Sequence, residues 1–336
     1  MWYSRYNKEV KHTMKEKQLR IGVLTSGGDA PGMNAVIRAV VRTATHYGIR
    51  VYGIKTGYDG LFRGDVDELD PSDVSDIIYR GGTILRTARC AEMMTEEGQR
   101  RAAEVIKVLW LDALIVIGGD GSFKGAKSLM QYGVNVMAIP ATIDLDMDCT
   151  EYTIGFDTAV NTVAETIVRL RDTSSSHERC SVVEVMGRDA GHLATWCGLT
   201  GGAEEVLIPE YPVDTAAVIE QILHNRASGK RHNLVVVSEG VGGSDSLASE
   251  IERILGIESR ATVLGHLQRG GMPTALDRMH ASVMGYRAVK AIKEGESNKV
   301  VVYRDGKHQL MDLNEALEMK KEYSPELYEI TKILAI

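Results

Sequence analysis

The sequence predicts an α/β protein built on parallel sheets that carry helices on both faces. Short apolar runs rich in β-branched residues alternate with helical patterns along the chain. The runs are continuously apolar, as in "ALIVIG" at 113–118, which is typical of strands buried on both faces. The length of 336 residues favours two domains over one.

The expected strands and helices alternate along the chain. Strands are expected at 20–25, 50–54, 113–118, 135–140, 181–187, 204–209, 233–240, 261–266 and 299–303. Helices are expected between them, for example at 33–47, 96–109, 157–172, 214–227 and 275–294. Several strands end in segments that combine Gly with Asp, Arg, Glu or His, such as "TSGGDAPG", "GGDGS", "MGRDAG" and "GHLQRGG". Ligands of open α/β sheets bind at the carboxyl ends of strands, so the active site is expected there.

Composition and charge argue against several classes of protein. A net charge of -7 argues against nucleic acid as the main partner, because such binding depends on basic patches. The first 18 residues are polar and the apolar runs are far shorter than a bilayer requires, so neither a signal peptide nor a membrane span is expected. Four cysteines without a C-x-x-C pair indicate reduced thiols in a cytoplasmic protein.

Two glycine-rich segments follow predicted strands. In "LTSGGDAPGMN", Gly27 and Gly28 precede a helix that opens near Pro31, so backbone N–H groups and the helix dipole could approach a phosphate. A tight turn would explain the same glycines. "VIGGDGSFKGAKS" matches neither G-x-x-x-x-G-K-[ST] nor G-x-G-x-x-G. Asp120 within it is either an ordinary Asp-Gly turn residue or a ligand of Mg²⁺.

Three carboxylates crowd the segment "AIPATIDLDMDCT", at the end of a predicted strand. Alternation in an extended segment would place Thr142, Asp144 and Asp146 on one face. One carboxylate could then accept a hydroxyl proton while the other orients a metal ion. The alternative is an exposed acidic turn with solvated side chains, which is the interpretation adopted for Asp148.

Arginines also follow glycine turns and strand ends, at Arg89, Arg179, Arg188, Arg260 and Arg269. A guanidinium group matches phosphate oxygens bidentately and keeps its charge. Each arginine alone could form a surface ion pair, but this many at such positions in an acidic protein favour an anionic ligand. His266 could be a buried core histidine, and its proximity to Arg269 favours a sugar-phosphate site instead.

These motifs together resemble those of the bacterial-type ATP-dependent 6-phosphofructokinases. The resemblance runs from about residue 20 to the C-terminus and includes, in family order, "GVLTSGGDAPGMNA", "RGGTIL", "VIGGDGS", "TIGFDTA", "RDTSSSHER", "VEVMGR", "ATVLGHLQRGG" and the "DR" at 277–278. It implies two three-layer α/β/α domains with mainly parallel sheets, an active site in the cleft between them, and a homotetramer. The domains implied are an N-terminal extension at 1–19, a larger ATP-binding domain at 20–155 plus 268–318, and a smaller sugar-phosphate-binding domain at 156–267 plus 319–336.

The activity implied by the resemblance is phosphoryl transfer from MgATP to the 1-hydroxyl of fructose 6-phosphate, which gives fructose 1,6-bisphosphate and ADP in the committed step of glycolysis. Asp144 would be the catalytic base, Thr142 would position the transferred phosphoryl group and Arg188 would neutralise its charge. ATP would be surrounded by Gly28, Arg89, Cys90, Gly119, Asp120, Gly121 and Ser122, and Mg²⁺ would be bound by Asp120 and Asp146. The sugar phosphate would be bound by Thr142, Asp144, Asp146, Arg179, Met186, Gly187, Arg188, Glu239, Arg260, His266 and Arg269, with Arg179 and Arg260 supplied by a neighbouring subunit.

The chain departs from the family pattern around the base, which reads PGTIDND in the family and "PATIDLD" here. Ala141 replaces glycine, Leu145 replaces asparagine, and "MDC" at 147–149 replaces an Ile-Pro-Gly type turn. Gly121 and Ala141 favour ATP, because pyrophosphate-dependent relatives tend to carry Asp and Lys at these positions. A pyrophosphate-dependent or other sugar-phosphate kinase, and a catalytically weakened sugar-phosphate sensor, stay open as alternatives.

The resemblance also implies a separate effector site for ADP or phosphoenolpyruvate at a subunit interface. The positions that match it are Arg38, Arg42, Arg171, Glu204 and Lys230. Pro71 and Ser228 stand where some family members carry basic residues, which weakens the expectation of regulation.

Overall fold

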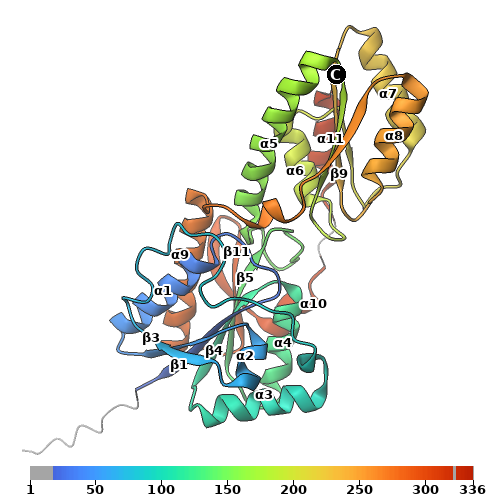
Figure 1. The fold of residues 1–336 in the computed structure, drawn as a ribbon. Coiled ribbons are helices and arrows are strands. Elements are labelled where there is room, and N and C mark those ends of the chain that lie inside the picture. The colour runs from blue at the N-terminus through green and yellow to red at the C-terminus, as the bar shows by residue number, and fades with distance from the viewer. Residues whose placement is uncertain (1–17, 321–322, 336) are drawn as a thin grey trace, which may run out of the picture.

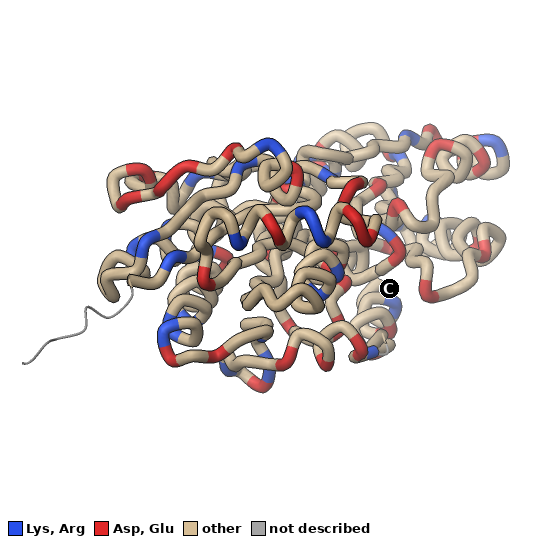
Figure 2. The backbone as a smooth tube through the Cα atoms, turned by 90° about the horizontal axis from the view of Figure 1, so that it is seen from below, with Lys and Arg blue, Asp and Glu red and all other residues tan. Residues whose placement is uncertain are grey.

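The computed structural model describes residues 18–320 and 323–335, which form two lobes side by side (Figure 1). The larger lobe contains an eight-stranded sheet and the smaller lobe a four-stranded sheet. The predicted N-terminal extension at 1–19 lies outside the described residues apart from Gln18 and Leu19. Acidic and basic positions are interspersed over both lobes in the view of Figure 2.

The sheet of the larger lobe is parallel except at its two edges. Its strands are β1 (Arg20–Ser26), β2 (Arg50–Ile54), β3 (Val66–Leu69), β4 (Ala113–Gly118), β5 (Val136–Thr142), β6 (Ile154–Gly155), β11 (Lys299–Arg304) and β12 (Lys307–Asp312). Their order is β12-β11-β5-β4-β1-β2-β3, with β6 paired to the end of β5. Only β2 with β3 and β11 with β12 run antiparallel. All six residues of β4 are buried, which confirms the prediction from its continuous apolar run.

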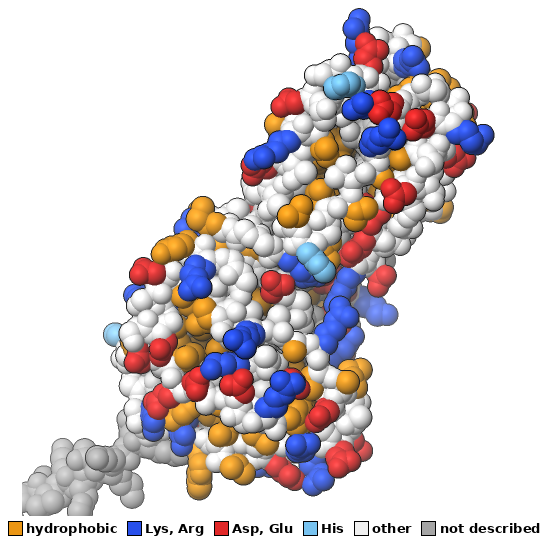
Figure 3. Space-filling model, viewed as in Figure 1, with side chains coloured by type: hydrophobic (Ala, Val, Ile, Leu, Met, Phe, Trp, Pro, Cys, Tyr) orange, Lys and Arg blue, Asp and Glu red, His pale blue; other side chains and the backbone are white. Residues whose placement is uncertain are grey.

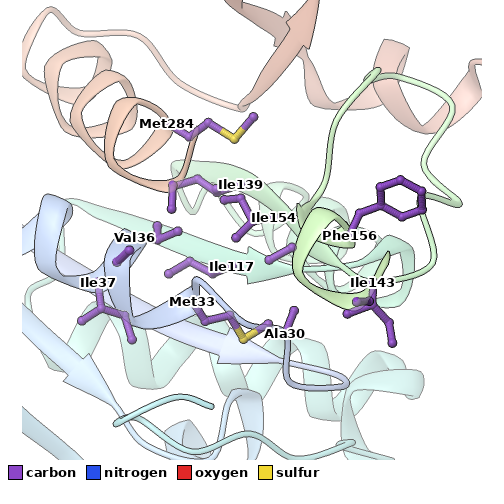
Figure 4. Close-up of a cluster of buried hydrophobic side chains, with 14 of the residues drawn as sticks. Ala30, Met33, Val36, Ile37, Ile117, Ile139, Ile143, Ile154, Phe156 and Met284 are labelled. Atoms are coloured by element: carbon purple, nitrogen blue, oxygen red, sulfur yellow. The ribbon is translucent and has the colours of Figure 1, made fainter. Parts of the chain in front are cut away.

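Helices cover both faces of this sheet, as Figure 1 shows. One face carries α1 (Met33–His46) and α9 (Ala275–Lys293), and the other carries α2 (Tyr58–Arg63), η1 (Glu92–Met94), α3 (Glu96–Val108), α4 (Asp120–Met130) and α10 (Leu313–Glu318). Successive β4 side chains alternate between two cores: Ile117 packs in the cluster of Val36 and Met284 (Figure 4), whereas Val116 packs in the cluster of Phe123.

The smaller lobe repeats the same three layers with a wholly parallel sheet. Its strands are β7 (Cys180–Val185), β8 (Glu205–Leu207), β9 (Asn233–Ser238) and β10 (Ser259–Val263), in the order β10-β7-β9-β8. Its helices are α5 (Phe156–His177), α6 (His192–Gly201), α7 (Thr215–Ala227), α8 (Ser244–Leu255) and α11 (Pro325–Leu334). Residues of α5, α6 and α11 pack in one core and those of α7 and α8 in another, so the predicted fold class of two three-layer α/β/α domains is confirmed.

The main differences from the expected elements lie at strand ends. The strands expected at 181–187 and 233–240 end at Val185 and Ser238, and the strand expected at 261–266 ends at Val263. Residues Gly265–Arg269 instead form a 3₁₀ helix, η2, because Gly265 has a φ of 49° that no strand residue adopts. The helix expected at 157–172 extends over Phe156–His177.

The chain crosses between the lobes after β6, at η2 and between α10 and α11 (Figure 1). The residue boundaries of the two domains stay a prediction. Within the described part of the chain, no helix combines the length and the apolar character needed to cross a membrane. The four cysteines are free thiols.

Candidate active site

Polar segments from the two lobes meet at their junction. The turn after β5 in the larger lobe faces the turn after β7 in the smaller one, and charged and histidine side chains lie at this junction in Figure 3. These two turns follow the carboxyl ends of β5 and β7, the position at which open α/β sheets bind ligands.

The turn after β5 holds Thr142, Asp144 and Asp146. The backbone N–H of Asp144 donates to Thr142 Oγ1 at 3.2 Å, and this hydroxyl donates to Asp144 Oδ2, also at 3.2 Å. Leu145 adopts the left-handed region with a φ of 53°. The expectation of a shared face on an extended segment is wrong, because β5 ends at Thr142 and a local turn brings the two carboxylates together.

Both carboxylates of this turn lie largely away from water. Asp144 is 2% exposed, and burial raises its pKa, as does the neighbouring Asp146, while Arg269 and Arg188 lower it. Burial also raises the pKa of Asp146. Arg188 Nε lies 3.8 Å from Asp144 Oδ2, and Arg188 Nη1 lies 3.5 Å from Asp146 Oδ2. The positive charge of this guanidinium group, which belongs to the smaller lobe, therefore compensates the negative charges of the two carboxylates in the larger lobe.

One oxygen on each carboxylate has no partner. Asp144 Oδ1 and Asp146 Oδ1 are buried and accept no hydrogen bond from the described residues. A buried polar atom without a partner is costly, and at a functional site it indicates a ligand that supplies a donor or a cation. A substrate hydroxyl at Asp144 and a hard cation at Asp146 would both satisfy this requirement.

The turn after β7 positions Arg188. Gly187 has a φ of 138° and Arg188 a φ of 53°, so the chain turns sharply there. Glu239 Oε1 accepts hydrogen bonds from the backbone N–H groups of Gly187 at 3.1 Å and Arg188 at 2.8 Å. Met186 N–H donates to Gln268 Oε1 at 3.1 Å. The predicted sugar residues Met186, Gly187 and Glu239 are therefore part of one hydrogen-bonded unit.

The glycine-rich loops after β1 and β4 are joined by hydrogen bonds. Ser122 Oγ donates to the carbonyl of Ser26 at 2.8 Å, and Thr87 Oγ1 donates to the carbonyl of Gly27 at 2.8 Å. These bonds bring the predicted nucleotide residues Gly28, Gly119, Gly121 and Ser122 next to the loop that carries Arg89 and Cys90. Arg89 is exposed and Cys90 is half-buried, and burial raises the pKa of the Cys90 thiol.

Asp120 is the first residue of α4 and forms an ion pair with Lys124 Nζ at 2.6 Å. Its charge contributes to the raised pKa of Asp146. Among residues 18–320 and 323–335, no group of three or more His, Cys, Asp or Glu side chains gathers to hold a metal. Two carboxylates are a sufficient protein contribution for Mg²⁺ only if phosphate oxygens and water complete the shell.

Arg269 connects the two halves of the site. Its Nη1 donates to the carbonyl of Asp29 at 3.1 Å, and a Cβ on Gly28 would lie only 2.6 Å from this nitrogen. Any larger residue at position 28 would therefore displace the guanidinium group. His266 is exposed on the same 3₁₀ helix.

Arg179 and Arg260 lie away from the carboxylates: Arg179 directly precedes β7, and Arg260 lies in the edge strand β10. Both pair with Glu258, at 2.7 Å from Arg179 Nε and 2.9 Å from Arg260 Nη2. Within one chain the structure does not bring these two arginines to Asp144, and their role in a neighbouring subunit stays a prediction.

The five positions predicted for an effector separate into two groups. Glu204, with a side chain only 1% exposed, pairs with Lys230 Nζ at 2.9 Å and with Arg171 Nη2 at 3.6 Å. Arg38 and Arg42 lie on α1 in the other lobe, where the nearby Arg42 charge helps to lower the pKa of Arg38. Within one chain the structure brings together three of the five.

Comparisons with known proteins agree with this architecture. The family model described as Phosphofructokinase matches residues 20–292. A relative named ATP-dependent 6-phosphofructokinase from Clostridium botulinum is 54% identical over 315 residues, which are 94% of this chain and 99% of that protein. A Clostridium perfringens protein named ATP-dependent 6-phosphofructokinase 1 is 53% identical over the same shares.

Solved structures show the same fold. A chain of phosphofructokinase from Saccharomyces cerevisiae superimposes with a TM-score of 0.83 at 34% identity, over 95% of this chain, and this chain spans about half (48%) of that longer one. A pyrophosphate-dependent phosphofructokinase from Marinobacter aquaeolei superimposes with a TM-score of 0.82 at 23% identity, over 92% of this chain and 86% of that one, which supports the fold alone. The resemblance found in the motifs is confirmed, and the chain belongs to the phosphofructokinase family.

Proposed function

We propose that the chain is an ATP-dependent 6-phosphofructokinase in which Asp144 is the catalytic base. It transfers a phosphoryl group from ATP to the 1-hydroxyl of fructose 6-phosphate, with fructose 1,6-bisphosphate and ADP as products, as its close relatives are named to do. The observation that carries the assignment of the base is a buried carboxylate with a raised pKa, one unpartnered oxygen and an arginine from the opposite lobe.

The chemistry of Asp144 follows from this environment. Its raised pKa makes it a stronger proton acceptor than an exposed aspartate, and its unpartnered Oδ1 can receive the hydrogen bond of the sugar hydroxyl. Thr142 holds Oδ2, so the carboxylate cannot rotate freely. Phosphoryl transfer is catalysed mainly by positioning and by charge stabilisation, and Arg188 is placed to stabilise the group in transit.

Asp120 and Asp146 would hold Mg²⁺. The unpartnered Oδ1 of Asp146 supports this assignment, because carboxylate oxygens are the ligands that a hard cation takes. When bound with ATP, the ion supplies positive charge along the phosphate chain. Gly28, Arg89, Cys90, Gly119, Gly121 and Ser122 would bind the nucleotide, and their loops are joined through Ser26 and Gly27.

Met186, Gly187, Glu239, His266 and Arg269 would bind the sugar phosphate from the side of the smaller lobe. Glu239 uses only Oε1 for the turn after β7, so Oε2 is free of those two bonds and can accept from a sugar hydroxyl. His266 and Arg269 would bind the 6-phosphate.

A coupled assay with purified protein tests the function directly. ATP with fructose 6-phosphate and Mg²⁺ should support turnover, and removal of Mg²⁺ should abolish it. Pyrophosphate as donor, and tagatose or sedoheptulose phosphates as acceptors, should be poor substrates. A preference for pyrophosphate would contradict the interpretation of Gly121 and Ala141. Sugar-phosphate binding without turnover from any donor would favour the sensor alternative.

We propose a homotetramer in which Arg179 and Arg260 complete the 6-phosphate site of a neighbour. Their pairing with Glu258 at the edge of the smaller sheet, away from their own Asp144, supports this arrangement. Arg260→Ala and Asp144→Asn proteins should each be inactive. Mixed tetramers should regain activity, because an intact Asp144 then meets an intact Arg260. If co-expression restores no activity, Arg260 does not act across an interface.

We propose ADP or phosphoenolpyruvate as effectors at Arg171, Glu204 and Lys230, with Arg38 and Arg42 contributed across an interface. The two cations on the buried Glu204 support a site for an anionic effector. Titrating both compounds against the sugar-saturation curve, with Lys230→Gln as the variant, tests this regulation. A response to neither compound would contradict it.

A further inference from the structure

The carboxyl end of β7 lies between β10 and β9, and both neighbours stop pairing with it within one residue of each other. On one side the ladder reaches Val263 opposite Glu184, and the N–H of Leu264 then donates to the Glu184 carbonyl at 3.1 Å. On the other side it reaches Ser238 opposite Val185, and the N–H of Glu239 donates to the Val185 carbonyl at 2.7 Å.

Side chains replace the next bond on both sides. In a continued parallel ladder, Met186 N–H would donate to the Leu264 carbonyl and Gly187 N–H to the Glu239 carbonyl. Instead, Met186 N–H donates to Gln268 Oε1 and Gly187 N–H to Glu239 Oε1, both at 3.1 Å. Strands β9 and β10 can therefore diverge from β7 at this point. The turn at 186–188 is instead hydrogen-bonded to one side-chain oxygen on each side.

Gln268 uses both ends of its amide and is completely buried. Its exposed fraction is 0%, and its Nε2 donates to the carbonyl of Gly265 at 3.1 Å. The residue lies within η2, drawn in orange at the junction of the lobes in Figure 1, between His266 and Arg269. One amide therefore links the helix that carries these two residues to the turn that carries Arg188.

We propose that Gln268 is a positioning residue that sets the span between the two ends of the sugar-phosphate site. This inference rests on the proposed function, in which Arg188 acts at the reacting end of the sugar and His266 and Arg269 bind its 6-phosphate. A substrate of fixed length reacts well only if both ends are held at a matching separation. Gln268 would not contact the substrate itself and would act through the positions of Arg188, His266 and Arg269.

The experiment compares two variants of Gln268 with a matched control. Gln268→Met keeps the length of the side chain but removes both hydrogen bonds. Gln221→Met is the control, because Gln221 on α7 also donates one hydrogen bond, to Asn225 Oδ1 at 3.0 Å, and belongs to no part of the proposed site. Gln268→Glu keeps an acceptor for Met186 N–H but places a second oxygen against the Gly265 carbonyl.

For Gln268→Met we expect kcat/KM for fructose 6-phosphate to fall by about tenfold or more, because a buried N–H loses its acceptor, while KM for ATP changes less than about twofold. Gln221→Met should leave both parameters near the wild-type values. Gln268→Glu should approach the wild type as the pH falls, because a protonated carboxyl group can again donate to Gly265 and accept from Met186.

Three results would overturn the inference. The first is an unchanged kcat/KM for fructose 6-phosphate in Gln268→Met, and the second is a change in KM for ATP in that variant as large as the loss toward fructose 6-phosphate. The third is a ratio of Gln268→Glu activity to wild-type activity that does not change with pH. If Gln268→Met does not fold, the pH comparison decides by itself. A failure of the proposed function is distinguishable, because the wild-type protein would then not phosphorylate fructose 6-phosphate at all.

Discussion

Replacement of Asp144 by Asn should lower turnover and raise stability at neutral pH. Asp144 is 2% exposed, and burial together with Asp146 raises its pKa above that of an ordinary aspartate. Ionisation of this carboxyl group therefore costs more free energy in the folded protein than in the unfolded chain. Asn keeps the size of the side chain and an oxygen that can still accept from Thr142, so it removes the charge without removing the turn.

The sign of the stability effect follows from proton linkage. A carboxyl group with a raised pKa in the folded state binds its proton more tightly there than in the unfolded chain. Its favourable contribution is complete below the unfolded pKa and is lost as the pH rises through the folded pKa. The variant should therefore gain stability near pH 7, because Arg188 and Arg269 offset the buried charge only in part, and the gain should vanish in acid.

The loss of turnover should be much larger in energy than this gain. Removal of a general base costs about 10² to 10⁴ in rate, which corresponds to about 3 to 5 kcal/mol of transition-state stabilisation. The measurements are turnover, sugar binding and denaturation at pH 7 and at acidic pH, with Asp148→Asn as the control from the same segment. Turnover above about a tenth of the wild-type rate would refute Asp144 as the base. A fall in stability together with lost sugar binding would make Asp144 structural.

Three further predictions test charge and strain. Arg188→Gln should move the acid limb of kcat/KM to higher pH, because this guanidinium lowers the pKa of Asp144, and an unmoved limb would refute the contact. Burial and His308 lower the pKa of His280 to about 4, so stability should fall as the pH drops from about 6.5 toward 4, and His280→Phe should flatten that loss in acid denaturation. Trp110 is 70% exposed at a φ of 55°, so Trp110→Asn should raise the unfolding free energy by about 0.5 kcal/mol, and a decrease would contradict the strain argument.

The strands were predictable because most of them are buried on both faces. The run at 113–118 matches β4 at both ends, since a continuous run of buried apolar β-branched residues leaves few other local structures. Helix α6 was not predicted, because its sequence "HLATWCGLTG" is apolar or small on most positions and has no clear polar face. The ends of β7, β9 and β10 were placed too late by two or three residues, because the turns that follow them begin without a clear change in the sequence pattern.

The residue types of the site were also predictable, but their geometry was not. Glycine with Asp or Arg at strand ends indicated the loops, and the family motifs implied the roles, which stay a prediction. The turn at 142–146 depends on a left-handed Leu145, a conformation that Leu rarely adopts, so alternation gave the wrong arrangement. The predicted domain bounds already separate Arg38 from Arg171, but the pairing of Arg171 and Lys230 with Glu204 depends on tertiary packing that spacing does not show.

The joining of the lobes depends on a buried carboxylate, Asp277 of α9. Its oxygens accept hydrogen bonds from the N–H groups of Gly155 at 2.7 Å and Thr158 at 2.9 Å, at the start of α5, and from the Tyr152 hydroxyl at 2.5 Å. Thr274 N–H donates in return to Thr158 Oγ1 at 3.0 Å. Burial raises the pKa of Asp277, whereas these hydrogen-bond donors lower it. The negative charge of Asp277 is therefore stabilised by neutral donors and by the N-terminus of α5.

Through these hydrogen bonds Asp277 joins α5 and α9. These two helices follow two of the three places where the chain passes from one lobe to the other. The crossing segments begin within a few residues of the site: β6 pairs with the end of β5, and η2 leads into α9. Because Asp144 belongs to one lobe and Arg188 to the other, any change in the angle between the lobes changes their separation. The hydrogen bonds of Asp277 join α5 to α9 next to the place where Asp144 of one lobe meets Arg188 of the other, so this buried cluster supports the relative position of the two side chains.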